Sequence, residues 1–132
     1  MTCREAMRTD FDFCVAEERL NDALEIMSAT GGNLVPVVET REEMRYLGVI
    51  TAREAAIRLG LRDLRPSEVM CRELADVRAG CAAPGDDATR SRESLGRQGA
   101  SSLPVVEEGK LIGVLPAAGV AAQPADSGPT RR

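Results

Sequence analysis

The sequence predicts a mixed α/β (α+β) fold built from two copies of one β-α-β-β-α unit, because the chain of 132 residues contains an internal repeat. Three segments align with later segments in the same order: residues 15–39 with 83–107, residues 47–50 with 112–115, and residues 5–7 with 68–70. The shifts are 68, 65 and 63 positions, so we expect three additional residues in the first hairpin and five additional residues near positions 75–82. Both copies contain the motif Pro-Val-Val-Glu, which is typical of a buried strand.

The first copy begins with an extended segment and continues with a helix. Apolar residues recur there at positions i, i+3, i+4 and i+7, with polar residues between them, and this spacing predicts an amphipathic helix. The apolar residues are Leu20, Ala23, Leu24 and Met27. Gly31 and Gly32 follow, and we expect the helix to end there because glycine adopts the left-handed C-cap conformation at low cost.

Two strands and a second helix complete the first copy. Residues 34–38 form an apolar, β-branched run that is too short for a helix and fits a buried strand. The charged residues 40–45 predict a turn, and residues 46–50 predict the returning strand. Residues 52–59 then predict the second helix.

The second copy keeps the strands but has a poorer first helix. Its positions equivalent to the apolar stripe are Ala88, Ser91, Arg92 and Leu95, and Gly96 lies within the same segment. Glycine in a helix interior costs about 1 kcal/mol relative to alanine, and an arginine side chain enters a core only at a high cost. We therefore expect this helix to be short, loosely packed or partly irregular.

The repeat predicts the domain organisation. We expect repeat 1 at residues 1–62 and repeat 2 at residues 63–122. Residues 123–132 are polar and rich in proline and glycine, which is typical of a disordered C-terminal tail.

The composition argues against several classes of function. The net charge is −4, so the chain has no general attraction to nucleic acid or to anionic membranes. Three aromatic residues offer little surface for stacking bases, and we expect no nucleic-acid partner. The sequence contains no histidine, which removes the usual general base and the usual zinc ligand. We therefore expect a protein that is not an enzyme and holds no metal.

The thiols and the apolar segments indicate the compartment. The sequence contains four cysteines: Cys3, Cys14, Cys71 and Cys81. None forms a CxxC pair, so we expect free thiols in a reducing cytosol. The N-terminus is charged where a secretory signal would be apolar, and Pro116 interrupts the longest uncharged run. We expect a cytoplasmic chain, or the cytosolic part of a membrane protein, without direct membrane insertion.

The tandem pattern of a Pro-Val-Val strand, a hairpin, and a Gly-hydrophobic-hydrophobic segment before a helix resembles the CBS-domain pair (Bateman module) over about residues 4–122. The resemblance implies two pseudo-symmetric repeats that pack through their sheets and often assemble as a homodimer. It also implies a cytosolic regulatory module that senses AMP, ADP, ATP or S-adenosylmethionine and needs no cofactor. Such modules regulate an attached or partner enzyme, channel or transporter.

The resemblance also implies a nucleotide site at the last helix of the first repeat. In the family, a Thr or Ser at the helix start binds phosphate, and an Asp three residues later binds the ribose hydroxyls. Residues 48–54 read GVITARE, so the resemblance implies a phosphate contact at Thr51 and a ribose contact at Glu54, which is one methylene longer than Asp. Arg53 would add a second phosphate contact. A helix N-terminus suits this role because its free N–H groups and its dipole attract anions.

An adenine slot would lie beside this helix start. The resemblance implies that Asn33, Leu34 and Val35 line it, together with the preceding segment around Phe13 and Cys14.

The same residues also have a purely structural interpretation. Thr-x-x-Glu before an apolar helix is the pattern of a capping box, in which Thr51 and Glu54 satisfy each other's backbone N–H groups without any ligand. Arg53 could equally be a solvated surface charge. Both interpretations stay open at the level of the sequence.

The second repeat lacks the residues that the family uses. Pro116 and Gly119 stand where the hydroxyl and the carboxylate would be, so we expect no phosphate or ribose contact there. Ser101 and Ser102 are the polar groups that remain. The chain would therefore have at most one good nucleotide site.

Two classes of function follow. The first is a sensor of an adenine nucleotide, and the second is a ligand-free dimerisation or interaction module. Residues 7–11 show a weaker resemblance to the cytoplasmic tails of prokaryotic ClC-type chloride channels and transporters. The small-residue faces of residues 52–59 and 117–122 are the expected dimer surfaces, unless they close the core of a single chain.

Overall fold

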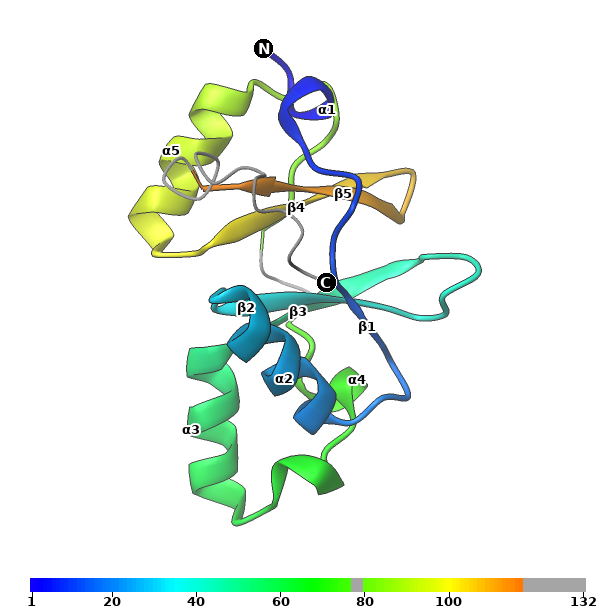
Figure 1. Ribbon diagram of the computed structural model, residues 1–132, viewed down its shortest axis with the longest axis vertical. Coiled ribbons are helices and arrows are strands. Elements are labelled where there is room, and N and C mark those ends of the chain that lie inside the picture. Colours follow the sequence, from blue (N-terminus) through cyan, green and yellow to red (C-terminus); the bar gives the residue numbers. More distant parts are fainter. Residues whose placement is uncertain (77–79, 118–132) are drawn as a thin grey trace.

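The computed structural model describes residues 1–76 and 80–117 (Figure 1). The predicted tail at residues 123–132 lies outside this range, and so does nearly all of the last helix predicted over residues 117–122.

The first repeat forms a three-stranded sheet in the order β1-β2-β3. Its strands are β1 (Cys14–Val15), β2 (Leu34–Val38) and β3 (Tyr46–Thr51), and its helices are α2 (Leu20–Thr30) and α3 (Ala52–Arg62). Strand β2 pairs parallel with β1 and antiparallel with β3. The predicted limits of β2 are confirmed, and so is the end of α2, because its C-cap residue has the left-handed conformation with φ of 74°.

The described part of the second repeat has the same helix-strand-strand order as α2, β2 and β3. Helix α5 (Ala88–Gln98) precedes the antiparallel pair of β4 (Ser102–Glu107) and β5 (Lys110–Pro116). Val38 pairs with Tyr46 in the first hairpin, and Val106 pairs with Leu111 in the second, so the first hairpin is longer by three residues as predicted. The two sheets lie against each other in the middle of the molecule, with the helices on the outer sides (Figure 1).

A short lead helix precedes each repeat, and it reveals a misalignment in our sequence analysis. The lead helices are α1 (Cys3–Ala6) and α4 (Cys71–Leu74), and both start with the sequence CRE. Their separation is 68 positions, and the residues that follow keep this separation, since Arg8 bridges to Val114 and Asp76, 68 positions after Arg8, bridges to Val49. The predicted shift of 63 positions, with an insertion near 75–82, is therefore wrong. Residues 66–68 belong instead to a 3-10 helix (Pro66–Glu68) that packs against α2.

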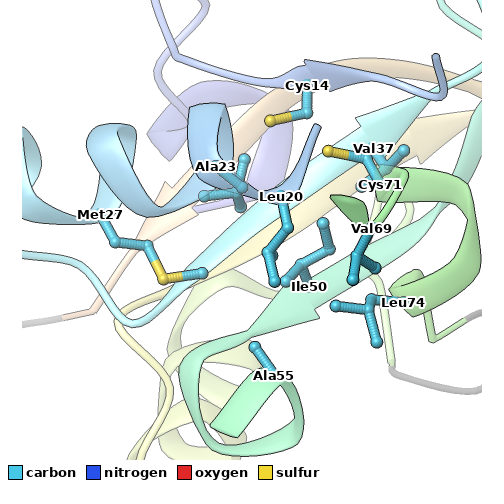
Figure 2. Packing of buried hydrophobic residues seen from close by; sticks show 11 residues of the cluster. Cys14, Leu20, Ala23, Met27, Val37, Ile50, Ala55, Val69, Cys71 and Leu74 are labelled. Carbon is cyan, nitrogen blue, oxygen red and sulfur yellow. The ribbon is translucent and has the colours of Figure 1, made fainter. Parts of the chain in front are cut away.

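Each lead helix packs with the other repeat. Helix α1 contacts α5 and β5, whereas α4 contacts β1 and β3 (Figure 1). The first buried cluster therefore contains Cys71 and Leu74 beside residues of α2, β2 and β3 (Figure 2). The second contains Cys3 beside Val105 and Leu115. Each packed half thus combines residues from both sequence copies, and the limits 1–62 and 63–122 stay a prediction.

Helix α5 is regular, which contradicts our expectation of a short or irregular helix. It has 11 residues, the same length as α2. Asp87 caps its start by accepting the N–H of Arg90, and Gly99 ends it in the left-handed conformation. The expected problem does not arise at Arg92, because this side chain is half-buried and its Nε donates to the carbonyl of Pro116 at 3.3 Å.

The hairpin tips also connect the two halves. The N–H of Tyr46 donates to the carbonyl of Gly109, and the N–H of Leu111 donates to the carbonyl of Met44, both at 2.9 Å. Within the described residues, no helix has the length and apolar character that are needed to cross a bilayer.

Candidate functional site

A cavity of about 420 Å³ lies between the two repeats. The first repeat contributes the start of β2, the end of β3 and the start of α3: Asn33, Leu34, Val49, Thr51, Ala52 and Arg53. The volume lies within the range of small-molecule sites, which is about 300–1,000 Å³.

The start of α3 forms one end of the cavity. Thr51 is the N-cap residue, and its hydroxyl oxygen accepts the N–H of Glu54 at 3.0 Å. The carbonyl of Asn33 accepts the N–H of Ala52 at 2.9 Å and so fixes the start of the helix to the start of β2. The first turn of a helix carries a partial positive charge, so this end of the cavity favours an anion.

The second repeat forms the opposite wall. It contributes Gly80, the end of α5 and the start of β4: Leu95, Gln98, Gly99, Ala100, Ser102, Leu103 and Pro104. Of these residues, the sequence indicated only Ser102 as a candidate site residue. The repeat itself carried the missing signal, because positions 34 and 102 are equivalent and two sheets that pack at their strand starts bring both to one place.

Asn33 joins the two repeats at the edge of the cavity. Its N–H donates to the Ser101 hydroxyl at 3.1 Å, and the N–H of Ser101 donates to Asn33 Oδ1 at 3.0 Å. Its Nδ2 also donates to the carbonyl of Gly99 at 2.7 Å. Asn33 and Ser101 are equivalent positions of the two copies, 68 apart, so this reciprocal pair lies where the pseudo-symmetric halves meet. Ser101 therefore has a structural partner.

Glu54 does not line the cavity. Its carboxylate accepts from Arg58 Nε at 2.9 Å, one turn further along α3. The capping box predicted from Thr-x-x-Glu is thus only half formed, because Thr51 caps Glu54 while the Glu54 carboxylate pairs with Arg58.

Three residues of the predicted adenine slot lie elsewhere. Val35 and Cys14 are part of the buried cluster of the first packed half. Figure 2 shows Cys14 and Cys71 in this cluster. A side-chain hydrogen bond with Cys71, and secondly burial, raises the pKa of the Cys14 thiol. Phe13 packs against Phe11 at 5.9 Å between ring centroids. The predicted residues that the structure brings to the cavity are Asn33, Leu34, Thr51, Arg53 and Ser102.

Comparison with known proteins gives the class of the chain. Residues 3–59 match the family model of the CBS domain. No curated protein matches the sequence. These residues are therefore similar to a CBS domain, and the chain as a whole has the mixed α/β fold of a CBS domain pair.

Three solved structures illustrate the likeness of the fold. Hypoxic Response Protein I, solved with two coordinated zinc ions, has 21% identity and a TM-score of 0.74, and the match covers 92% of this chain and 97% of that chain. CBSX2 in complex with AMP has 19% identity and a TM-score of 0.66, covering 87% and 89%. The CBS domain pair of protein MJ0100, in complex with 5′-methylthioadenosine and S-adenosyl-L-methionine, has 14% identity and a TM-score of 0.69, covering 92% and 93%.

The zinc ions of Hypoxic Response Protein I have no counterpart site among the described residues of this chain. These residues contain no group of three or more His, Cys, Asp or Glu side chains that could hold a metal ion.

Proposed function

We propose that the chain is a regulatory module that binds an adenine nucleotide in the cavity between its two repeats. One observation carries the proposal: the cavity is large enough for a small molecule and combines apolar walls with the N-terminus of α3, the Thr51 hydroxyl and Arg53. Structures of the same fold, CBSX2 with AMP and MJ0100 with adenosyl compounds, support an adenine-containing ligand.

The position of the cavity suggests how ligand binding would regulate an attached or partner protein. Its walls come from both repeats, so a bound ligand contacts α3 from one repeat and α5 from the other. A ligand stabilises the arrangement of the halves that it binds more tightly, and it shifts the equilibrium by no more than its difference in affinity for the two arrangements. The readout would be the activity of an attached or partner enzyme, channel or transporter. This chain would act in the cytoplasm without catalysis of its own.

The test is calorimetric titration of the purified chain with AMP, ADP, ATP and S-adenosylmethionine. We expect micromolar binding of one of them at one site per chain, and about a tenfold loss of affinity in Thr51→Ala, since a hydrogen bond to a charged group contributes about 1.5–3 kcal/mol. Thr51→Ser keeps the hydroxyl and should retain the affinity. Absence of binding by all four compounds would contradict the proposal.

Thr40→Ala is a matched control for the loss of a cap. The Thr40 hydroxyl accepts the N–H of Glu43 at 3.2 Å in the first hairpin, which is the same type of bond, and Thr40 does not line the cavity. The control should bind as the unmodified chain does. Both variants should first be checked by urea unfolding, because the loss of a helix cap costs about 1 kcal/mol.

A ligand-free pairing module is the second candidate. The observation that favours it is the outer face of α3, where Ile57 is 46% exposed and Leu61 is 80% exposed. Exposed apolar side chains one turn apart suit contact with a second protein chain, which would be another copy in a homodimer. The weaker resemblance of residues 7–11 to ClC-type proteins stays a prediction.

A further inference from the structure

The charge of the cavity bears on which adenine-containing ligand it would take. Among the described residues, Arg53 is the one charged side chain that lines the cavity. Arg53 is exposed and forms no ion pair with any other residue in the described part of the chain, so its guanidinium is available to a ligand. It follows Thr51 and Ala52 at the start of α3, where the helix dipole adds to its positive charge.

Acidic groups are absent from the same lining. The described residues that line the cavity include no Asp or Glu. Glu54, the carboxylate next to this site in sequence, has its Oε2 at 2.9 Å from Arg58 Nε. Apart from Arg53, the polar side chains of the described lining are uncharged: Asn33, Thr51, Gln98 and Ser102. Among the described lining residues, a cationic ligand would therefore find no counter-charge, and a sugar diol would find no carboxylate to accept its two O–H groups.

The pairing of Glu54 with Arg58 would not by itself prevent a contact with a ligand. An exposed i,i+4 ion pair contributes only about 0.2–0.5 kcal/mol, so the energy needed to break it is small. The placement of the carboxylate outside the lining is the stronger argument, because a hydrogen bond needs a distance of about 3 Å. A variant at Glu54 is consequently part of the test.

We infer that the cavity selects its ligand by a negatively charged group and does not read the sugar hydroxyls. It would take nucleoside phosphates, with ribose or 2′-deoxyribose alike, in preference to S-adenosylmethionine, whose sulfonium and ammonium groups give it a net positive charge. This inference rests on the proposed function and specifies the ligand class of the same site.

The test is titration of the full chain with AMP, 2′-deoxy-AMP, adenosine and S-adenosylmethionine at one ionic strength. We expect AMP and 2′-deoxy-AMP to bind with dissociation constants within about threefold of each other, since the described lining residues offer no charged acceptor for the hydroxyl. Adenosine should bind at least about tenfold more weakly, because it has no anionic group to pair with Arg53 and the start of α3. S-adenosylmethionine should also bind at least about tenfold more weakly, because its single carboxylate is accompanied by two cationic groups that Arg53 and the helix start repel.

Variants of three residues on α3 make the test specific. Arg53→Gln should lower the affinity for AMP about five- to tenfold and leave the affinity for adenosine unchanged. This modest effect is expected of an exposed charge. Arg62→Gln removes the same charge from the other end of α3, outside the cavity, and should leave both affinities unchanged. Glu54→Gln should leave the ratio of AMP to 2′-deoxy-AMP unchanged.

The outcomes separate this inference from the proposed function. If AMP binds but adenosine or S-adenosylmethionine binds as tightly, or if Arg53→Gln has no effect, selection by charge is wrong and the nucleotide site stands. A preference for AMP over 2′-deoxy-AMP above about tenfold that disappears in Glu54→Gln would show that Glu54 reads the ribose, against this inference. If none of the four compounds binds, and ADP and ATP do not bind either, the proposed function and the inference both fall.

Discussion

The hydroxyl of Tyr46 is buried without a hydrogen-bond partner among the described residues. Tyr46 is the first residue of β3, and its backbone N–H is used in the contact with Gly109. Burial, and secondly electrostatic repulsion from Cys81 and Asp76, raises the pKa of the Tyr46 hydroxyl above its ordinary value. A buried and unpartnered polar group destabilises a fold, typically by about 1–3 kcal/mol relative to a paired one.

Tyr46→Phe should therefore stabilise the protein or leave its stability unchanged near neutral pH. The variant keeps the ring and removes only the unpartnered oxygen, so we expect the free energy of unfolding to rise by up to about 1 kcal/mol. Urea unfolding followed by circular dichroism measures this difference. A loss of about 1 kcal/mol or more would show that the hydroxyl has a partner in solution.

The two proteins should also differ in their response to alkaline pH. Because the folded pKa of Tyr46 is raised, the folded state keeps its proton where the unfolded state, with a pKa of about 10, loses it. The contribution of this retained proton to the free energy of unfolding is fully present below about pH 10. It is lost as the pH rises toward the folded pKa of Tyr46. The stability of the unmodified chain should consequently fall more steeply than that of Tyr46→Phe above this pH. Parallel curves would contradict the raised pKa.

At the scale of an element, α5 shows how caps compensate for a poor helix sequence. Its interior contains Gly96, yet the helix has 11 residues because Asp87 and Gly99 satisfy its two ends. A Cβ at Gly96 would have no neighbouring atom within 4 Å, so a methyl group fits there without any shift.

Gly96→Ala should therefore stabilise the chain by about 0.5–1 kcal/mol, since alanine has the higher helix propensity. Thermal unfolding should show a midpoint higher by a few degrees for a domain of this size. Gly99→Ala is the matched control, because Gly99 has φ of 71° and an alanine there is strained. The control should lower the midpoint. A lower midpoint in Gly96→Ala would mean that the helix end is not regular in solution.

The sequence predicted the elements that have a clear period or a clear terminator. The apolar stripe of α2 and the end of that helix at Gly31 were predicted correctly, and so were the limits of β2. Helix α5 was misjudged because Arg92 was counted as a core residue, whereas its charge reaches the carbonyl of Pro116 at the edge of the core. The lead helices have four residues each, which is about one turn, so no amphipathic period could reveal them.

The candidate site was predicted on one side only. The helix start at Thr51 and Arg53 follows from local sequence, and so does the strand start at Asn33 and Leu34. The wall from α5 depends on how the two sheets pack, and no local pattern encodes that arrangement. Glu54 is a case where two local partners compete, since the backbone of Thr51 and the side chain of Arg58 are both in reach and the ion pair forms.

At the scale of the whole molecule, the outer face of α3 bears on the assembly. Ala56, Ile57 and Leu61 are exposed on one helix, and the described residues of this chain do not cover them. If a second copy covers this face, the mass in sedimentation should be twice 14.1 kDa.

Ala56→Glu should then convert the dimer into a monomer without unfolding it. A charge at the centre of an apolar contact is costly to bury, whereas the same side chain on a solvated helix surface is tolerated. Analytical ultracentrifugation of the two proteins tests this, with circular dichroism as the check on folding. An unmodified chain that sediments as a monomer at all concentrations would contradict the homodimer.

The packing of each lead helix against the other repeat has a consequence for synthesis on the ribosome. Residues 2–8 are made before the other elements of the two repeats, but Asp87 and Val114, with which Thr2 and Arg8 form backbone pairs, are made much later. At about 5–20 residues per second, the start of the chain must wait roughly 5–20 s for its last partner strand. The first packed half can close earlier, because it needs nothing beyond Asp76. The order of translation thus favours a nascent chain in which one half is complete while the opening segment is still unpaired and open to chaperones.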